Sequence, residues 1–164
     1  MTANALDLLQ QQLPPAGASA AWSHGVLVSE LSPAELLPTV QRLKSQFGFD
    51  VFLDVTAVDW PRHALRFEVV YHFYSTALKV RVRLKVRVPE AEPFVDSLVS
   101  LYGSAGYMER ECHEMYGIKF RGNDDLRPIL LYEGFVGHPL RKDYPKNHAQ
   151  PLVEYRPPQG SLER

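Results

Sequence analysis

The sequence has one cysteine and no long apolar run. The first excludes an internal disulfide, and the second argues against a membrane-spanning helix. A single thiol cannot form an internal disulfide, which fits a reducing compartment. No apolar stretch approaches the roughly 20 residues that a membrane-spanning helix needs. The first residues lack a basic segment followed by an apolar core, so they do not resemble a secretory signal. We therefore expect one cytosolic domain of 164 residues.

The sequence also lacks the short motifs that bind nucleotides and metals. It contains neither GxGxxG nor GxxxxGK[ST], the glycine-rich loops that hold phosphates. One cysteine excludes a CxxC site, and the six histidines include no pair at i, i+4. A net charge of −1 gives no overall attraction to nucleic acid. We expect no metal, no cofactor and no nucleic acid to be bound by this chain.

What is present predicts an α+β domain over residues 1–116, with a mostly antiparallel sheet and helices on one face. Alternation of apolar residues indicates strands, spacings of three and four indicate helices, and glycine or proline marks the ends. The expected elements are a helix at 4–12, an edge strand at 25–31, a helix at 33–47, strands at 51–60, 66–75 and 79–88, and helices at 93–102 and 106–116.

The strand expected at 79–88, KVRVRLKVRV, places five cations on one face, at Lys79, Arg81, Arg83, Lys85 and Arg87. Such a row could bind phosphates, anionic lipid or an acidic protein, and a steep loss of binding with salt would reveal phosphate contacts. No aromatic residue interleaves with the basic ones, as it does in most single-strand binders. We favour a solvated sheet face whose charges are neutralised by neighbouring strands.

The segment ERECHEMYGIKF, which runs from Glu109, combines acids and bases with the only cysteine and has the composition of an active site. On a helix, Cys112 shares a face with Met108 and Met115, which predicts a packed thiol. An isolated enzyme would have to use Glu111, His113 and Glu114 as acid and base. No pocket motif accompanies them, so we favour an ion-paired helix face.

The last segment, 117–164, is called the tail below, and it loses all periodicity. It holds six of the 13 prolines and five of the 10 glycines, yet it is rich in apolar and aromatic residues. Disordered segments are usually poor in aromatics, and long structureless loops are uncommon within compact domains. We predict an extended, irregular, partner-binding tail, and the alternative is a tail folded back on its own domain.

Two blocks of the sequence resemble a known family. ERECHEMYGIKFRGNDDLRPILL, followed by EGFVGHPLRKDYP, closely resembles the signature of the C subunit of NADH:quinone oxidoreductase, respiratory complex I, the 30 kDa subunit family. The match covers residues 108–145, and the upstream order of elements resembles the family's domain. Two departures occur, because Asn123 stands where the family usually has His and Pro128 where a second Arg is common. Asn cannot carry a proton at neutral pH, so no titrating group is inherited at position 123.

The resemblance implies a non-catalytic member of the hydrophilic arm that binds the D subunit, the large subunit of the quinone site, next to the B and I subunits. FMN and the iron–sulfur centres would belong to neighbouring subunits, and the complex would lie peripherally on the cytoplasmic side of the bacterial inner membrane. By resemblance, Glu109, Arg110, Glu111 and Glu114 would fix the last helix and its junction with the tail. Six residues would lie along the partner, namely Arg127, His138, Arg141, Lys142, Asp143 and Tyr144.

An alternative from a related class remains open. The equivalent subunit of a membrane-bound [NiFe] hydrogenase or formate hydrogenlyase shares the domain. A flavin-binding, NADH-oxidising neighbour in the purified complex would exclude that alternative.

Overall fold

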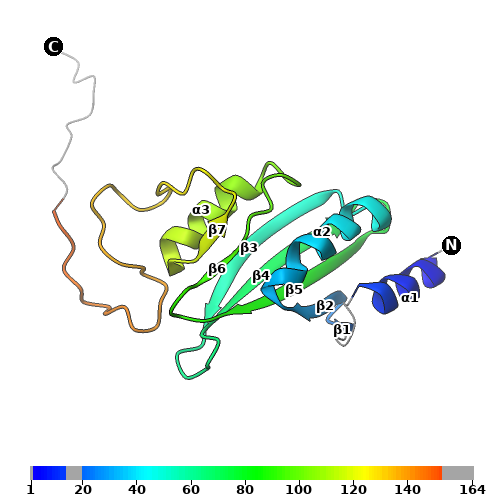
Figure 1. Cartoon of the computed structure of the whole chain (residues 1–164), viewed down its shortest axis with the longest axis horizontal. Helices are drawn as coiled ribbons and strands as arrows, with labels where there is room; N and C mark the ends of the chain where they lie inside the picture. The colour runs from blue at the N-terminus through cyan, green and yellow to red at the C-terminus, as the bar shows by residue number, and fades with distance from the viewer. Residues whose placement is uncertain (1, 14–19, 153–164) are drawn as a thin grey trace, which may run out of the picture.

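A computed structural model describes residues 2–13 and 20–152, and its largest element is a five-stranded sheet (Figure 1). The strands are β1 (Ala20–Ser23), β2 (Val26–Leu31), β3 (Val51–Asp59), β4 (Phe67–Ser75) and β5 (Val80–Val88), in the order β1-β2-β5-β4-β3. Neighbouring strands are antiparallel except β2 and β5, which are parallel. The predicted fold class is therefore confirmed, including the β4–β5 hairpin.

Three helices accompany the sheet: α1 (Thr2–Gln12), α2 (Pro33–Phe47) and α3 (Ala105–Tyr116). Helix α2 begins where the sequence predicts, because the Glu35 carboxylate accepts the Ser32 N–H at 2.8 Å. It ends at Gly48, whose φ of 65° lies in the left-handed region that a residue with a side chain adopts only with strain. The apolar stripe of α2, which includes Leu36 and Leu43, is fully buried on the sheet.

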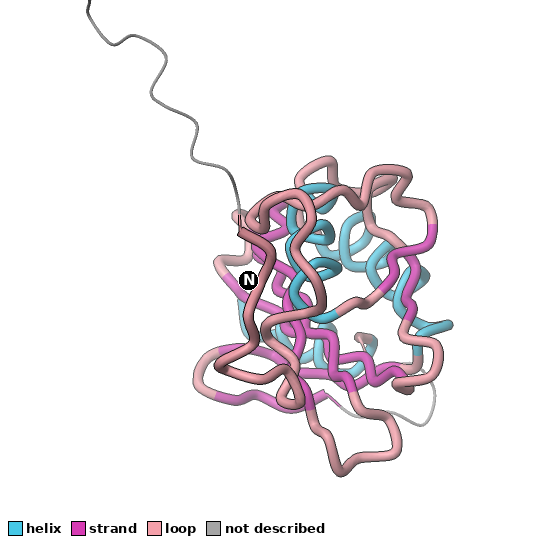
Figure 2. The backbone as a smooth tube through the Cα atoms, turned by 90° about the vertical axis from the view of Figure 1, so that its left-hand side faces the viewer, coloured by secondary structure: helices cyan, strands magenta, loops and turns pink. Residues whose placement is uncertain are grey.

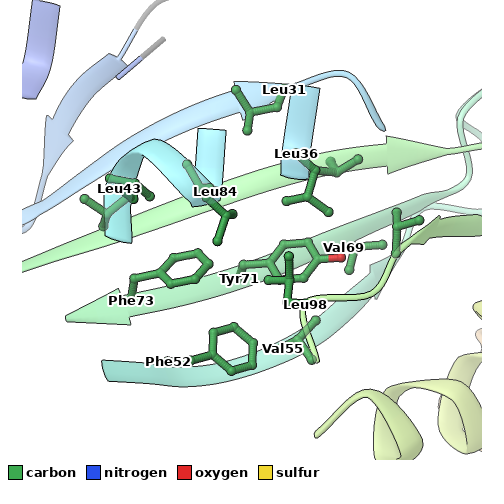
Figure 3. Close-up of a cluster of buried hydrophobic side chains, with 14 of the residues drawn as sticks. Leu31, Leu36, Leu43, Phe52, Val55, Val69, Tyr71, Phe73, Leu84 and Leu98 are labelled. Carbon is green, nitrogen blue, oxygen red and sulfur yellow. The ribbon is translucent and has the colours of Figure 1, made fainter. Parts of the chain in front are cut away.

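The core lies between the sheet and helices α2 and α3 (Figure 3). Cross-strand register aligns Tyr71 with Val55 on one side and Leu84 on the other, so all three point to the same face. The rings of Phe52 and Phe73 stand 5.2 Å apart within this layer. Truncating Leu84, which has no exposed surface, to Ala is expected to cost about 2–5 kcal/mol.

A second, smaller unit places α3 against the sheet. Strand β6 (Phe94–Asp96) pairs in parallel with β7 (Lys119–Arg121), and α3 is the crossover between them. The helix expected at 93–102 is therefore wrong. Its spacing of apolar residues is helical, but β6 instead pairs with β7, and the backbone N–H of Leu98 donates to the Glu109 carboxylate at 2.8 Å.

Two further comparisons with the sequence concern β2 and the tail. Strand β2 is not an edge strand, because the short β1, which periodicity does not reveal, covers its outer side. The tail was predicted to be irregular from residue 117, but β7 lies at its start and pairs with β6. Residues 122–152 form neither helix nor strand, as predicted. These loops lie at the α3 end of the domain, in front of the sheet and helices in Figure 2. Residues 153–164 of the tail lie outside the described residues.

Candidate protein interface

Helix α3 divides its polar residues between the inside of the protein and its surface. Cys112 is buried in the core, as its spacing predicts, and burial raises the pKa of its thiol. Glu111 is exposed. His113 donates from Nδ1 to the carbonyl of Ile118 at 2.8 Å. In the part of the chain that the structure describes, no hydrogen bond joins Glu111, His113 and Glu114 to one another.

Glu109 is a buried carboxylate that ties α3 to the segments on either side. Its side chain is 0% exposed. It accepts hydrogen bonds from the Ser97 hydroxyl at 2.7 Å, the Leu98 N–H at 2.8 Å and the Asn123 side-chain amide at 2.9 Å. Burial raises the pKa of Glu109, although all three hydrogen bonds act in the opposite direction. Asn123, which stands where the family usually has His, thus donates a hydrogen bond to the Glu109 carboxylate.

Glu114, five residues further along α3, holds the tail. Its carboxylate oxygens accept three successive backbone N–H groups, from Ile129 at 3.0 Å, Leu130 at 2.8 Å and Leu131 at 3.2 Å. Arg110 adds two hydrogen bonds to tail carbonyls, at Arg127 (2.8 Å) and at the following residue (3.0 Å). Hydrogen bonds to charged groups are the stronger kind, so residues 127–131 are fixed to the helix through their backbone.

The tail then returns and caps the end of α3. The last carbonyls of a helix have no partner within the helix. Here the carbonyl of Glu114 accepts from His138 Nδ1 at 2.8 Å and that of Tyr116 from Arg141 Nε at 2.6 Å. Burial lowers the pKa of His138. Both side chains approach Gly117 closely, and its φ of 76° is in the left-handed region.

Glu109, Arg110 and Glu114 of α3 form the first anchor of the tail, and the cap by His138 and Arg141 forms the second. A third anchor lies at the end of the sheet, where Arg66 meets three carboxylates. It pairs with Asp59 at 2.8 Å, Glu90 at 2.5 Å and Asp143 at 2.9 Å. The backbone N–H of Lys142 donates to Asp59 at 2.7 Å. Sequence analysis missed Asp59 and Arg66. The available signal was an acid at the end of one strand and a base at the start of the next.

In addition to these anchors, the tail packs against itself. The ring of Phe135 contacts Tyr132 in an edge arrangement, with centroids 5.6 Å apart, and stacks on Tyr144 at 6.2 Å. Gln150 closes the loop, because its amide both accepts the Val136 N–H and donates to the Val136 carbonyl, each at 3.0 Å. Tyr144 is therefore part of an ordered loop of the chain.

Ten residues were predicted from the sequence as interface residues, and the structure separates them into three groups. Seven bind other parts of the chain at the three anchors: Glu109, Arg110, Glu114, His138, Arg141, Asp143 and, through its backbone, Lys142. Glu111 and Arg127 have exposed side chains, and Arg127 pairs with the nearby Asp125 at 2.8 Å. Tyr144 packs within the tail, against Phe135. Contact of any of the ten with a partner stays a prediction.

Two of the five cations of the basic strand are paired within the described residues. Lys85 and Arg87 both pair with the buried Glu68 of a neighbouring strand, at 3.0 and 2.7 Å, which agrees with the expected neutralisation for these two. Across residues 2–13 and 20–152, no group of three or more His, Cys, Asp or Glu side chains is placed to hold a metal ion. No helix in those ranges is long and apolar enough to cross a membrane.

The fold and these contacts define a class: a small α+β domain whose last helix carries an anchored, apolar, irregular tail. Comparison with known proteins gives the family. Residues 29–150 match the family described as respiratory-chain NADH dehydrogenase, 30 Kd subunit. The chain belongs to this family, which confirms the resemblance drawn from residues 108–145.

Named relatives agree with the family. The C subunit of NADH-quinone oxidoreductase from Ruegeria sp. (strain TM1040) is 41% identical over 145 residues, which cover 82% of this chain and 72% of the relative. The C 1 subunit of NADH-quinone oxidoreductase from Rhizobium etli (strain CIAT 652) is 44% identical over 124 residues, or 74% of this chain and 62% of the relative. The chain thus matches a subunit of the respiratory complex and spans less than two thirds of some relatives.

Two solved structures share the fold. The trypsin-resistant fragment (1-134) of Nqo5 superposes with a TM-score of 0.68 and 26% identity, over 74% of this chain and 99% of the fragment. A chain of the archaeal membrane-bound sulfane sulfur reductase superposes with a TM-score of 0.66 and 22% identity, over 77% and 73%. At that identity the second likeness concerns the fold alone.

Proposed function

We propose that this chain is a non-catalytic subunit of the peripheral arm of proton-translocating NADH:quinone oxidoreductase, and that it supports the quinone-reducing module by binding the large D subunit. The whole complex would carry electrons from NADH through FMN and iron–sulfur centres to quinone, with all these groups in neighbouring subunits. Membership of the 30 Kd subunit family supports the assignment to this complex. The arm would lie on the cytoplasmic side of the bacterial inner membrane, with the B and I subunits nearby.

One observation carries the attachment role: the tail holds its backbone to the domain and turns apolar side chains outward. Between β7 and Leu152, four such side chains are exposed, namely Ile129, Leu130, Val136 and Leu140. Exposed apolar side chains gathered on one ordered segment are typical of a protein–protein interface. The three anchors fix the shape of that segment before any partner arrives.

In this proposal the ten predicted interface residues have two roles. The carboxylates of Glu109 and Glu114, with Arg141 and Asp143, hold the tail in the conformation that binds. The exposed side chains of Arg127 and Lys142 meet the partner directly. Charges at such a surface set register and orientation more than they add affinity.

The hydrogenase-type alternative has weaker support. The fold does recur in a different respiratory complex, the sulfane sulfur reductase, but at 22% identity. The two curated relatives from NADH-quinone oxidoreductase are 41% and 44% identical. The composition of the purified complex separates the two assignments.

The test is co-purification from a bacterium that carries the complex and whose own copy of this subunit has been deleted. The full-length tagged chain is expressed at native level, and its partners are identified by mass spectrometry after gentle solubilisation. We expect the large quinone-site subunit, together with the flavin-binding subunit and NADH-oxidising activity. Recovery of hydrogenase subunits instead would establish the alternative. Recovery of the chain alone would contradict both assignments.

A further inference from the structure

Two parts of the tail that are ten residues apart in the sequence are fixed to the same turn of α3. Leu130 is held through its N–H, which donates to the Glu114 carboxylate at 2.8 Å. Leu140 is held through its N–H, which donates to the carbonyl of Met115 at 3.2 Å. The helix residues that receive these bonds are consecutive. Both leucine side chains nevertheless point outward, with 64% and 49% of their surface exposed.

We propose that Leu130 and Leu140 form one preassembled apolar contact that seats in an uncharged, apolar groove of the large neighbouring subunit. This inference rests on the proposed function and deepens it, because it names the part of the tail that is recognised and the chemistry of the surface that recognises it. Val136, although exposed, is held by Gln150 rather than by α3 and lies outside this contact.

The chemistry of the groove follows from the residues around the two leucines. Residues 129–132 are uncharged. The ring of His138 donates to the carbonyl of Glu114, and the Glu114 carboxylate is covered by three N–H groups of the tail. These nearby charges are thus used internally, whereas the side chain of Lys142 is exposed. A charged groove opposite the two leucines would be desolvated without a partner. An uncharged apolar surface complements this part of the tail.

The backbone of the tail argues for a protein partner rather than lipid. Residues 129–140 form neither helix nor strand, so many of their peptide groups depend on water or on a polar neighbour. Irregular backbone of this kind is not found exposed to the hydrocarbon of a bilayer. Glu133, which is exposed within the same segment, would also oppose insertion.

Preassembly matters because ordering a flexible segment at the moment of binding reduces affinity. The connection between the two leucines is itself closed, since Phe135 packs against Tyr132 and Tyr144. The side-chain amide of Gln150 forms hydrogen bonds with both the N–H and the carbonyl of Val136. The partner therefore meets two tail leucines whose backbone is already bound to one turn of α3.

The test uses the full-length chain and the complex it enters. Wild-type and variant chains carrying different tags compete for incorporation in the deletion strain, and the ratio of tags in the purified complex gives relative affinity. We expect Leu130→Ser and Leu140→Ser each to reduce incorporation about tenfold, the effect of losing one buried leucine. Leu152→Ser is the matched control, because Leu152 is 100% exposed and lies beyond the α3 anchors.

Glu114→Gln tests preassembly without changing any exposed leucine. A carboxamide offers one acceptor oxygen where the carboxylate offers two, so part of the hold on residues 129–131 is lost. We expect incorporation to fall about fivefold or more, with the midpoint of chemical denaturation showing that each variant folds. A leucine variant that fails to fold is replaced by Leu130→Ala or Leu140→Ala, which shorten the side chain without adding a polar group.

The outcomes separate this inference from the proposed function. If the wild-type chain enters the NADH-oxidising complex but both leucine variants match Leu152→Ser, the leucine contact is overturned and the proposed function stands. If the wild-type chain does not enter that complex, the proposed function fails. Flotation of the isolated chain with vesicles of phosphatidylcholine and phosphatidylglycerol, lost in Leu130→Ser, would overturn the protein groove in favour of lipid.

Discussion

The Asp59 carboxylate and the Arg66 guanidinium form an ion pair with two hydrogen bonds, both 2.8 Å long, at the end of the sheet. The tail also binds this pair, because the Lys142 N–H donates a hydrogen bond to Asp59 and the Asp143 carboxylate accepts one from Arg66. The hydrogen bonds from Arg66, followed by the single one from the Lys142 N–H, lower the pKa of Asp59. One buried pair therefore links the sheet to the distant part of the chain.

Asp59→Asn should destabilise the protein by about 3 kcal/mol, because it leaves a buried guanidinium without its two-bond partner. The measurement is urea denaturation at neutral pH. Glu90→Gln is the matched control: Glu90 pairs with the same Arg66, but its side chain is mostly exposed, so its loss should cost less than about 1 kcal/mol. Equal losses in the two variants would show that burial of the Asp59 pair does not determine its contribution.

Gly117→Ala should free the returning part of the tail. A Cβ at this position would meet the side chains of Arg141 and His138, which cap the last carbonyls of α3. The left-handed backbone adds about 1–2 kcal/mol of strain for any residue with a side chain. We expect faster trypsin cleavage after Lys142 and Lys146, read by mass spectrometry of timed digests.

Gly48→Ala separates the effect of backbone strain from the effect of displacing neighbouring side chains. Gly48 ends α2 in the same left-handed conformation, with φ 65°, but a Cβ there would meet no atom within 4 Å. It should lower stability by a similar amount of strain and leave cleavage of the tail unchanged. Matching cleavage rates in the two variants would mean that Gly117 acts only through its backbone.

Cys112 should be unreactive in the folded protein. Burial against the core raises the pKa of its thiol, which keeps the nucleophilic thiolate scarce at any ordinary pH. Reaction with Ellman's reagent at pH 8 should therefore be at least roughly a thousandfold slower than in guanidinium chloride, since it requires unfolding of a stable domain. A rate close to that of the unfolded chain would reopen a nucleophilic role for this residue.

Local sequence signals predicted most of the sheet, and non-local pairing explains what they missed. The strict alternation at 79–88 and the Ser32–Glu35 start of α2 are set within a few residues, so β5 and α2 were predicted correctly. Strand β6 was mistaken for a helix because its pairing partner β7 lies beyond α3. Strand β1 has only four residues, too few for a period to appear.

The candidate site shows the same division. Sequence reasoning selected Glu109 and Glu114 from their place in a charged helix. Four of the six groups that they bind are backbone N–H groups, which every residue except proline has and no sequence pattern marks. Asp59 and Arg66 gave a signal only in hindsight, because an acid and a base at strand ends occur in many hairpins. The positions of charges were predictable, and their partners were not.

Glu109 should make stability depend on pH in one particular window. Burial raises its pKa above the ordinary value of 4.5, so the folded chain binds this proton more tightly than the unfolded chain does. The contribution of Glu109 to the free energy of unfolding is therefore full below pH 4.5 and falls as pH rises from 4.5 through the raised pKa. Each unit of elevation corresponds to about 1.4 kcal/mol.

Glu109→Gln removes the titration, so the stability of the wild type relative to this variant should decline across that window and level off above it. Urea denaturation at a series of pH values measures the difference and cancels the contribution of other carboxylates. Ser97→Ala sharpens the test, because the Ser97 hydroxyl donates to Glu109 and lowers its pKa. Its loss should extend the decline to higher pH, since the remaining donors stabilise the carboxylate less. Parallel profiles for all three proteins would show that Glu109 keeps its ordinary affinity for the proton despite its burial.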